Sequence, residues 1–136
     1  MVNEISFPQR RQTLSRDERL RGKRQIEKLF ASGKTVQVMP LRIRFCQEEG
    51  PGPPVRVLFS VSSRSFRNAV SRNRIRRLMR EAYRRNKHLL TEPLQACGRH
   101  ALLAVQYQHH APSDYGSVEA SMRRALTQAA SGLCAS

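Results

Sequence analysis

The feature that most constrains the fold is a strongly basic segment, residues 68–90, which reads NAVSRNRIRRLMREAYRRNKHLL. It carries eight Lys or Arg side chains and one acidic residue, Glu81. Helical spacing places one set of residues on a single face: Ile75, Leu78, Met79, Ala82, Asn86, Leu89 and Leu90. Either Asn68 or Ser71 suits the N-cap of this helix. Because like charges repel, a helix with so one-sided a polar face indicates an anionic partner.

The charge of the whole chain supports the same interpretation. The chain has 136 residues, enough for one domain with one core, and a net charge of +15. Residues 61–90 contain ten basic and one acidic side chain, whereas residues 91–136 contain three of each. This asymmetry predicts a basic surface for a polyanion, and it favours nucleic acid over an anionic membrane.

The cysteines and the apolar runs exclude several classes of protein. Cys46, Cys97 and Cys134 are odd in number, and no two of them have CxxC spacing. We therefore expect reduced thiols in the cytoplasm and neither a disulfide framework nor a zinc site. No run approaches the ~18 apolar residues of a membrane span, and the N-terminus lacks the apolar core of a signal peptide.

Periodicity and turn residues predict the remaining elements. Residues 1–14 are expected to form a mobile arm, and residues 15–132 a single RNA-binding domain. Within the domain we expect a helix over 16–32 with Ser15 as its cap and Gly33 as its stop, strands over 35–47, 55–62 and 100–107, and a closing helix over 115–132. Pro40 predicts a break in the first strand. The short loop between the strands 35–47 and 55–62 predicts that these two strands form an antiparallel hairpin.

This order, α-β-β-(β)-α-β-α, predicts an α+β sandwich in which helices cover a mostly antiparallel sheet. Alternation in the first strand places Arg42 and Arg44 on the open face of that sheet. Together with Phe30 and Phe66, these cations suit a single-stranded nucleic acid, which needs charges along its backbone and rings for its bases. A position in the core is the alternative for both rings, and for Phe30 periodicity alone favours it.

No catalytic or metal-binding set is predicted. The histidines, His88, His100, His109 and His110, are scattered along the chain, and the pair Glu48–Glu49 lies in a loop without the context of a metal site. Arginine dominates the basic helix, and its planar guanidinium suits bidentate contacts with phosphate and stacking on bases. The residues themselves therefore indicate binding of RNA.

At residues 71–84, SRNRIRRLMREAYR resembles the RNR signature of the bacterial ribonuclease P protein family. The flanking stretches 19–34, 61–70 and 98–107 resemble the family's first helix, the entry to its basic helix and its last strand. The resemblance covers about residues 15–130. The chain departs from the family pattern in two places: Ser63 and Arg64 stand where paired Lys is usual, so one charge is missing, and Ile26 stands where Phe is frequent.

The resemblance implies the protein subunit of an enzyme that removes the 5′ leader of precursor tRNA, with catalysis and most Mg²⁺ binding in the RNA subunit. It also implies a left-handed strand–helix–strand crossover, against the usual rule. The residues implied to bind the catalytic RNA are Arg64, Arg67, Arg72, Asn73, Arg74, Arg76, Arg77, Arg80 and Arg84. Those implied to bind the leader are Arg19, Ile26, Phe30, Arg42 and Arg44. The partners are the ribonuclease P RNA and precursor tRNA, with no membrane and no obligate protein partner.

Three other functions are compatible with a basic helix. A ribosomal-type or general RNA-binding protein accounts for the charge, although not for the ordered resemblance. A DNA-binding regulator would place the helix in a major groove, but the charge covers most of the exposed face of this helix. A stand-alone nuclease would need a catalytic set of its own.

Overall fold

The computed structural model describes residues 14–64, 66–109 and 111–135. The arm predicted for residues 1–14 lies, except for Leu14, outside the described residues. The elements in chain order are η1 (Arg16–Glu18), α2 (Lys23–Ser32), β1 (Lys34–Val38), β2 (Leu41–Glu48), β3 (Val55–Val61), α3 (Ala69–Asn86), α4 (His88–Cys97), β4 (His100–Tyr107) and α5 (Tyr115–Cys134).

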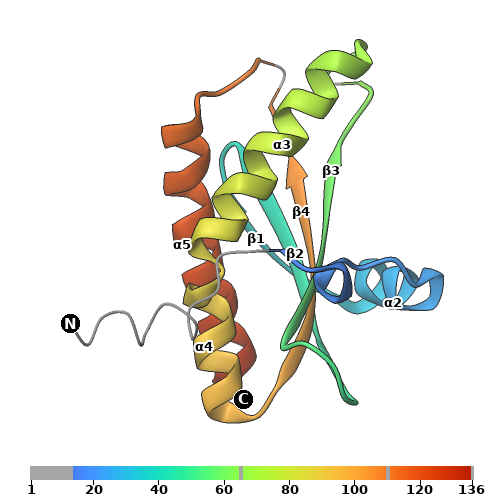
Figure 1. The fold of residues 1–136 in the computed structure, drawn as a ribbon, viewed down its shortest axis with the longest axis vertical. Helices are drawn as coiled ribbons and strands as arrows, with labels where there is room; N and C mark the ends of the chain where they lie inside the picture. The colour runs from blue at the N-terminus through green and yellow to red at the C-terminus, as the bar shows by residue number, and fades with distance from the viewer. Residues whose placement is uncertain (1–13, 65, 110, 136) are drawn as a thin grey trace.

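The strands form one sheet in the order β1-β2-β4-β3. The pairs β1–β2 and β2–β4 are antiparallel, and β3–β4 is parallel. The helices α3, α4 and α5 cover one face of the sheet, and α2 lies against the other (Figure 1). The predicted α+β class with a mostly antiparallel sheet is therefore confirmed. The handedness of the crossover from β3 to β4 stays a prediction.

The hairpin predicted between the strands 35–47 and 55–62 is wrong. These segments contain β2 and β3, and β4 lies between those two strands in the sheet. Phe45 of β2 and Val57 of β3 are both register partners of Leu103 in β4. All five residues from 101 to 105 are buried. A strand that is apolar on both faces is most stable in the interior of a sheet that is covered on both sides. The loop after β2 accordingly carries the chain past the place that β4 takes.

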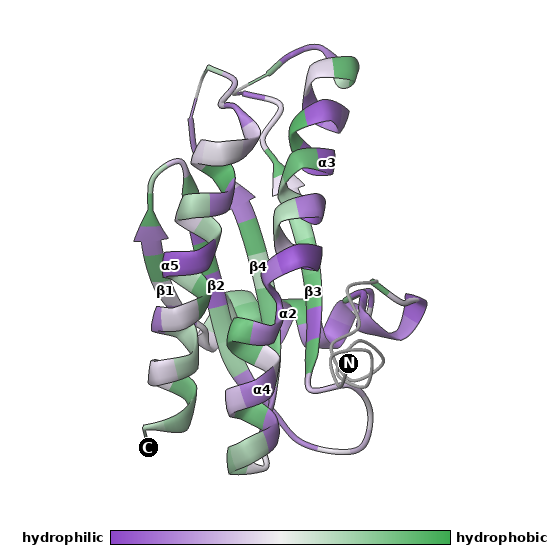
Figure 2. Ribbon diagram, turned by 60° about the vertical axis from the view of Figure 1, so that its left-hand side comes forward, coloured by the Kyte–Doolittle hydropathy of each residue, from purple (hydrophilic) through white to green (hydrophobic). Residues whose placement is uncertain are grey.

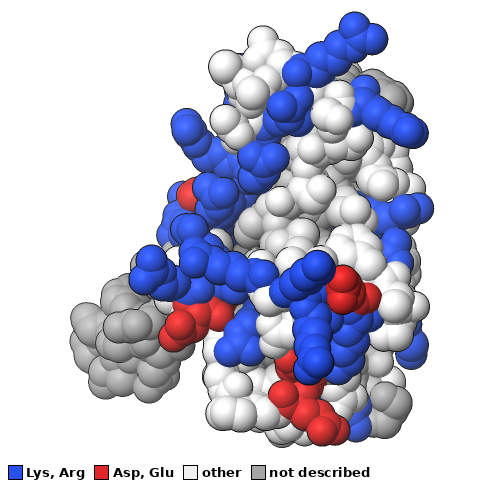
Figure 3. Space-filling view, turned by 90° about the vertical axis from the view of Figure 1, so that its right-hand side faces the viewer, with Lys and Arg blue, Asp and Glu red and all other residues white. Residues whose placement is uncertain are grey.

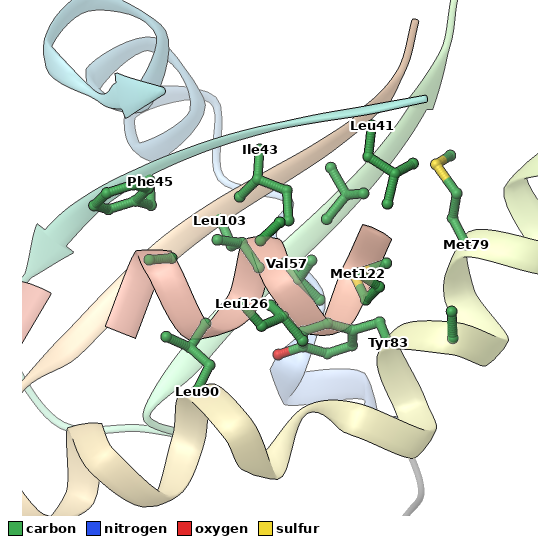
Figure 4. Packing of buried hydrophobic residues seen from close by; sticks show 14 of the residues in the cluster. Leu41, Ile43, Phe45, Val57, Met79, Tyr83, Leu90, Leu103, Met122 and Leu126 are labelled. Atoms are coloured by element: carbon green, nitrogen blue, oxygen red, sulfur yellow. The ribbon is translucent and has the colours of Figure 1, made fainter. Parts of the chain in front are cut away.

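Two apolar clusters hold the layers together. The larger one fills the space between the sheet and the helices α3, α4 and α5, with Ile43, Tyr83 and Leu126 among its fully buried members (Figure 4). The smaller one lies under α2, where Leu20 and Leu29 pack on Leu102 and Ala104. Tyr83 and the ring of Phe59 meet edge to face, with centroids 5.8 Å apart. Both faces of β4 are thus covered.

The predicted helix over 16–32 is only partly correct. Ser15 precedes the short 3-10 turn η1, and its N–H donates to the Glu18 carboxylate at 2.9 Å. The chain is then extended, and the N–H of Leu20 donates to the carbonyl of Val57 at 2.9 Å. The α-helix begins only after Gly22, because Leu20 must leave the helical path to reach the sheet.

Gly33 ends α2 as predicted, but for a steric reason. Its φ is −73°, so the left-handed region is not involved. A Cβ at this position would collide with the carbonyl oxygen of Leu29 and would lie 2.9 Å from Cγ of Arg44. Glycine thus lets the chain turn tightly from α2 into β1. The break predicted near Pro40 is also confirmed, since β1 ends at Val38 and β2 begins at Leu41.

The basic helix forms as predicted, with Asn68 as its cap: its Oδ1 accepts from the N–H of Val70 at 2.7 Å. In Figure 2, hydrophilic and hydrophobic stretches alternate along α3, as the sequence period requires. This helix ends at Asn86, so Leu89 and Leu90, which were predicted on its apolar face, lie instead in a second helix, α4, that was not predicted. The closing helix reaches Cys134 and is capped by Asp114, which accepts from the N–H of Ser117 at 2.8 Å.

Candidate nucleic-acid interface

Some of the basic side chains of α3 are neutralised within the chain. Glu81 pairs with Arg84, with 2.6 Å between Oε2 and Nη2, and with Arg85, with 3.3 Å between Oε2 and Nε. The hydrogen bond from Arg84 is the main cause that lowers the pKa of the Glu81 carboxyl. Exposed pairs of this kind contribute little stability. The negative charge of Glu81 therefore offsets part of the positive charge that Arg84 would offer to an anionic partner.

Two further cations serve the fold. The side chain of Lys87 is only 11% exposed, and its Nζ lies 2.7 Å from the carboxylate of Glu18. This pair fastens η1 to the junction of α3 and α4. The guanidinium of Arg72 donates to the carbonyls of Phe66 and Arg67 at 2.7 and 2.8 Å. Arg72 thus shapes the loop that enters α3.

The remaining basic residues of α3 are Arg74, Arg76, Arg77 and Arg80, here called the α3 arginine cluster. Asn73 accepts a hydrogen bond from Nη1 of Arg76 at 2.8 Å and so orients that guanidinium. Within the described part of the chain, none of the four has an ion pair with a carboxylate. In Figure 3 a band of Lys and Arg side chains follows α3 along one side of the molecule.

The cluster continues onto the segment before α2. Arg76 and Arg80 line a hollow of about 190 Å³ together with Arg19 and Arg21, above an apolar floor that includes Val57. Partial burial lowers the pKa of the Arg80 guanidinium, and repulsion from Arg19, Arg76 and Arg77 lowers it further. A phosphate group in this hollow would face cations from two elements and relieve their repulsion.

Arg19 was predicted to contact the same RNA strand as Phe30, Arg42 and Arg44. The structure places it instead beside the α3 arginine cluster. The cause is the extended path of residues 19–22, which runs beside β3 and joins it through a bridge from Arg19 to Val57. Sequence periodicity missed this path because it assigned these residues to a helix. Arg21, which no sequence pattern singled out, reaches the same hollow.

A second polar surface lies on the α2 side of the sheet. Phe30 is 38% exposed, and the guanidinium carbon of Arg44 lies 5.0 Å from its ring centroid. The structure therefore excludes the core position that periodicity favoured for Phe30. Ile26 is different: it is partly buried and packs on the small cluster under α2.

Beyond α2, a row of polar residues crosses this face of the sheet. The register aligns Gln37, Arg42, Gln106 and Ser60 on neighbouring strands. Nε of Arg42, Nε of Arg44 and Oε1 of Gln106 are buried atoms without a hydrogen-bond partner among the described residues. Buried polar atoms normally have partners, so this row is suited to a polar ligand. Gln106 was not predicted, although its alternation with buried Val105 and Tyr107 could have indicated it.

The other predicted residues lie in the loop before α3. Arg64 and Arg67 are exposed there, near the N-terminal end of the α3 arginine cluster. Phe66 is not part of the open sheet face: it packs on the larger core, with its ring centroid 5.8 Å from that of Tyr107. The predicted residues therefore form two groups, one around α3 and one on the sheet beside α2.

In the described ranges, no three His, Cys, Asp or Glu side chains gather as a metal site would require. The helices of these ranges also include none with the length and apolarity needed to cross a membrane.

Comparison with known proteins gives a consistent result. The family model described as Ribonuclease P matches residues 14–130. A ribonuclease P protein component from Porphyromonas gingivalis is 39% identical over 118 residues, which cover 86% of each chain. One from Chlorobaculum tepidum is 43% identical over 89 residues, covering 62% of this chain and 58% of the relative.

Solved structures agree in fold. The ribonuclease P protein of Staphylococcus aureus has a TM-score of 0.66 at 20% identity, with 82% of this chain and 94% of that chain covered. The protein from Thermotoga maritima also has a TM-score of 0.66, at 22% identity, with 82% and 96% covered. The sequence signature, the extent of the family match and the fold lead to one conclusion: this chain belongs to the ribonuclease P protein family.

Proposed function

We propose that this chain is the protein subunit that docks on the ribonuclease P RNA through the α3 arginine cluster and holds the 5′ leader of precursor tRNA on the open sheet face. The observation that carries the proposal is the concentration of arginines on α3 and around the hollow with Arg19 and Arg21. If the pairs of Glu81 are set aside, none of these arginines forms an ion pair with a carboxylate among the described residues. The RNA subunit then performs the cleavage, and the protein assists it.

The α3 surface is suited to a folded RNA. Its arginines project from one helix, so the spacing of their backbone attachment points is fixed before binding, and the planar guanidinium loses little freedom for each hydrogen bond that it forms. Arg74 and Arg77 are exposed, while Arg76 and Arg80 sit deeper beside the hollow. Such an arrangement can contact several phosphates at different depths, as the backbone of a structured RNA presents them. Asn86, one of the two asparagines of this helix, is buried and bonded to Glu119 and Arg123. It therefore cannot pair with an adenine in a major groove, which disfavours a DNA-binding regulator.

The sheet surface is suited to a single strand. Phe30 offers a ring on which a base can stack, with Arg44 held against it. Arg42 and Gln106 each have a buried polar atom with no hydrogen-bond partner among the described residues, and such an atom can bond to a ligand. Stacking together with cations is the usual way in which proteins hold single-stranded RNA. The leader of precursor tRNA is such a strand.

Mg²⁺ is part of the proposal as an ion held by the RNA and the substrate. The contribution of this chain is charge: arginines beside the RNA phosphates reduce the repulsion that the ions must otherwise screen. The protein should consequently lower the Mg²⁺ concentration that cleavage requires.

The leader contact is tested by replacing Phe30 in the assembled RNA–protein enzyme. Phe30→Ala should weaken binding of precursor tRNA with a 5′ leader by about 5- to 150-fold, since one stacked base contributes ~1–3 kcal/mol. Phe30→Tyr keeps the ring and should bind like the parent. The dissociation constants are measured by filter binding with a leader-bearing precursor and with mature tRNA.

Mature tRNA should bind the parent and Phe30→Ala enzymes equally well, because it has no leader to stack. Equal weakening for both RNAs would place Phe30 outside the leader site. No weakening for either RNA would leave the sheet face without its proposed role, while docking through α3 would be unaffected.

A further inference from the structure

Two of the three cysteines meet at the end of the molecule where α4 and α5 finish. Cys97 is the last residue of α4 and is exposed, and Cys134 is the last residue of α5 and is partly exposed. Their sulfur atoms lie 2.6 Å apart. Cys46, the third thiol, lies on the opposite face of the sheet, beside α2. Neither Cys97 nor Cys134 is among the residues of the two polar surfaces described above.

The backbones that carry this pair are fixed by their own helix ends. Gly98 caps α4 with φ of 70°, and the N–H of Arg99 donates to the carbonyl of Leu94 at 2.9 Å. At the end of α5, the N–H of Ala135 donates to the carbonyl of Ser131 at 3.0 Å, and Leu133 is buried. The two thiols are thus held together by the fold and remain open to a reagent from solvent.

We propose that Cys97 and Cys134 form a reversible redox site that closes to a disulfide when the chain meets a small-molecule disulfide such as oxidised glutathione. One thiol loses its proton, attacks a sulfur of the oxidant and expels one reduced glutathione, which leaves a mixed disulfide. The second thiol loses its proton and attacks the protein sulfur of that mixed disulfide, which expels the second glutathione. Two electrons pass from the protein to the oxidant, and the two protons go to the released thiolates.

Closure would join α4 to α5 covalently and enclose β4 in a loop of the chain. A cross-link between residues far apart in sequence restricts the unfolded chain and so raises stability, provided that the native geometry accepts it. Here the native contact already exists between the thiols. The site lies at the far end of the helical layer from the start of α3 (Figure 1), so closure stabilises the layer without covering the α3 arginine cluster.

The test treats the full-length protein with oxidised glutathione and digests it with trypsin after blocking the remaining thiols. The sequence places each cysteine in a different tryptic peptide: residues 45–56, 88–99 and 125–136. The proposal predicts that 88–99 and 125–136 are recovered as one disulfide-linked species that dithiothreitol separates. It also predicts that oxidation joins no two copies of the chain by a disulfide and that the oxidised protein melts about 5 °C or more above the reduced protein.

Matched variants separate this site from general thiol oxidation. Cys46→Ser should retain both the linked peptides and the rise in melting temperature. Cys97→Ser and Cys134→Ser should each lose both, while their reduced forms melt close to the reduced parent. Glutathione left on separate peptides, disulfides between two copies of the chain, or an unchanged melting temperature of the oxidised parent would each overturn the proposal.

Discussion

Reversing the charge of Arg76 and Arg80 together, with Arg76→Glu and Arg80→Glu, will weaken binding of the ribonuclease P RNA by about 100-fold or more. Each arginine is expected to lose a charge-assisted contact with phosphate, worth about 1.5–3 kcal/mol. The free protein should respond in the opposite direction. Arg80 is repelled by Arg19, Arg76 and Arg77, so removing that repulsion should leave the melting temperature equal or higher.

The two readouts together distinguish an RNA contact from a structural role. Affinity is measured by gel shift or filter binding at constant salt, and stability by thermal unfolding of the free protein. Arg124→Glu is the matched control, because Arg124 is an exposed arginine of α5 outside the proposed surfaces; it should weaken binding far less. If the double variant bound RNA like the parent, the α3 arginine cluster would not be the docking surface. A large drop in melting temperature would indicate a structural role.

Binding of the RNA will also fall steeply with salt. If the α3 arginine cluster, the hollow and the loop residues Arg64 and Arg67 together make ~6–10 phosphate contacts, affinity should drop by ~10³–10⁵ between about 50 and 200 mM monovalent salt. The reason is that each phosphate neutralised by an arginine releases a counterion, and added salt opposes that release. The measurement is a series of dissociation constants with Mg²⁺ held constant.

The charge-reversal variant provides an internal check on this slope. With two contacts removed, the logarithm of its affinity should depend on the logarithm of salt less steeply by about two. A flat response of the parent would refute the electrostatic account of docking. A parent slope that the variant retains in full would show that the contacts involve other residues.

The sequence predicted most accurately the elements that have a clear local pattern of apolar residues. The basic helix has one apolar stripe with a clear period, and Asn68, Met79 and Ala82 take the places expected of a cap and of packed residues. Strand β4 agrees residue for residue with the predicted range 100–107. In these segments, local propensity and burial favour the same structure.

The sheet order could not be obtained in this way. Pairing of β2 with β4 depends on which strand needs burial on both faces, and that becomes decisive only when the helices on each side are in place. The same limit explains residues 19–22. Leu20 lies within the predicted helix over 16–32, yet a hydrogen bond to Val57 and burial under α2 hold it in an extended path.

At the candidate site, sequence analysis identified the types of residue but not the groups within the chain that these residues contact. Lys87 and Arg72 have the same charge as Arg76, but Glu18 and the loop carbonyls engage them. Such contacts join residues distant in the chain or depend on the turn that a loop takes. Conversely, Arg21 reaches the hollow because of the chain path of residues 19–22, which no local pattern encodes. For Gln106, alternation with buried Val105 and Tyr107 was the local signal.

The most direct test of the account is cleavage of a precursor tRNA with a 5′ leader by a bacterial ribonuclease P RNA at low Mg²⁺, with and without this chain. We predict that the RNA alone is nearly inactive under these conditions and that the protein restores cleavage at the mature 5′ end, while the protein alone cleaves nothing. If the protein binds the RNA and cleavage stays unchanged, the chain is a general RNA-binding protein in this assay, and the proposed function is wrong.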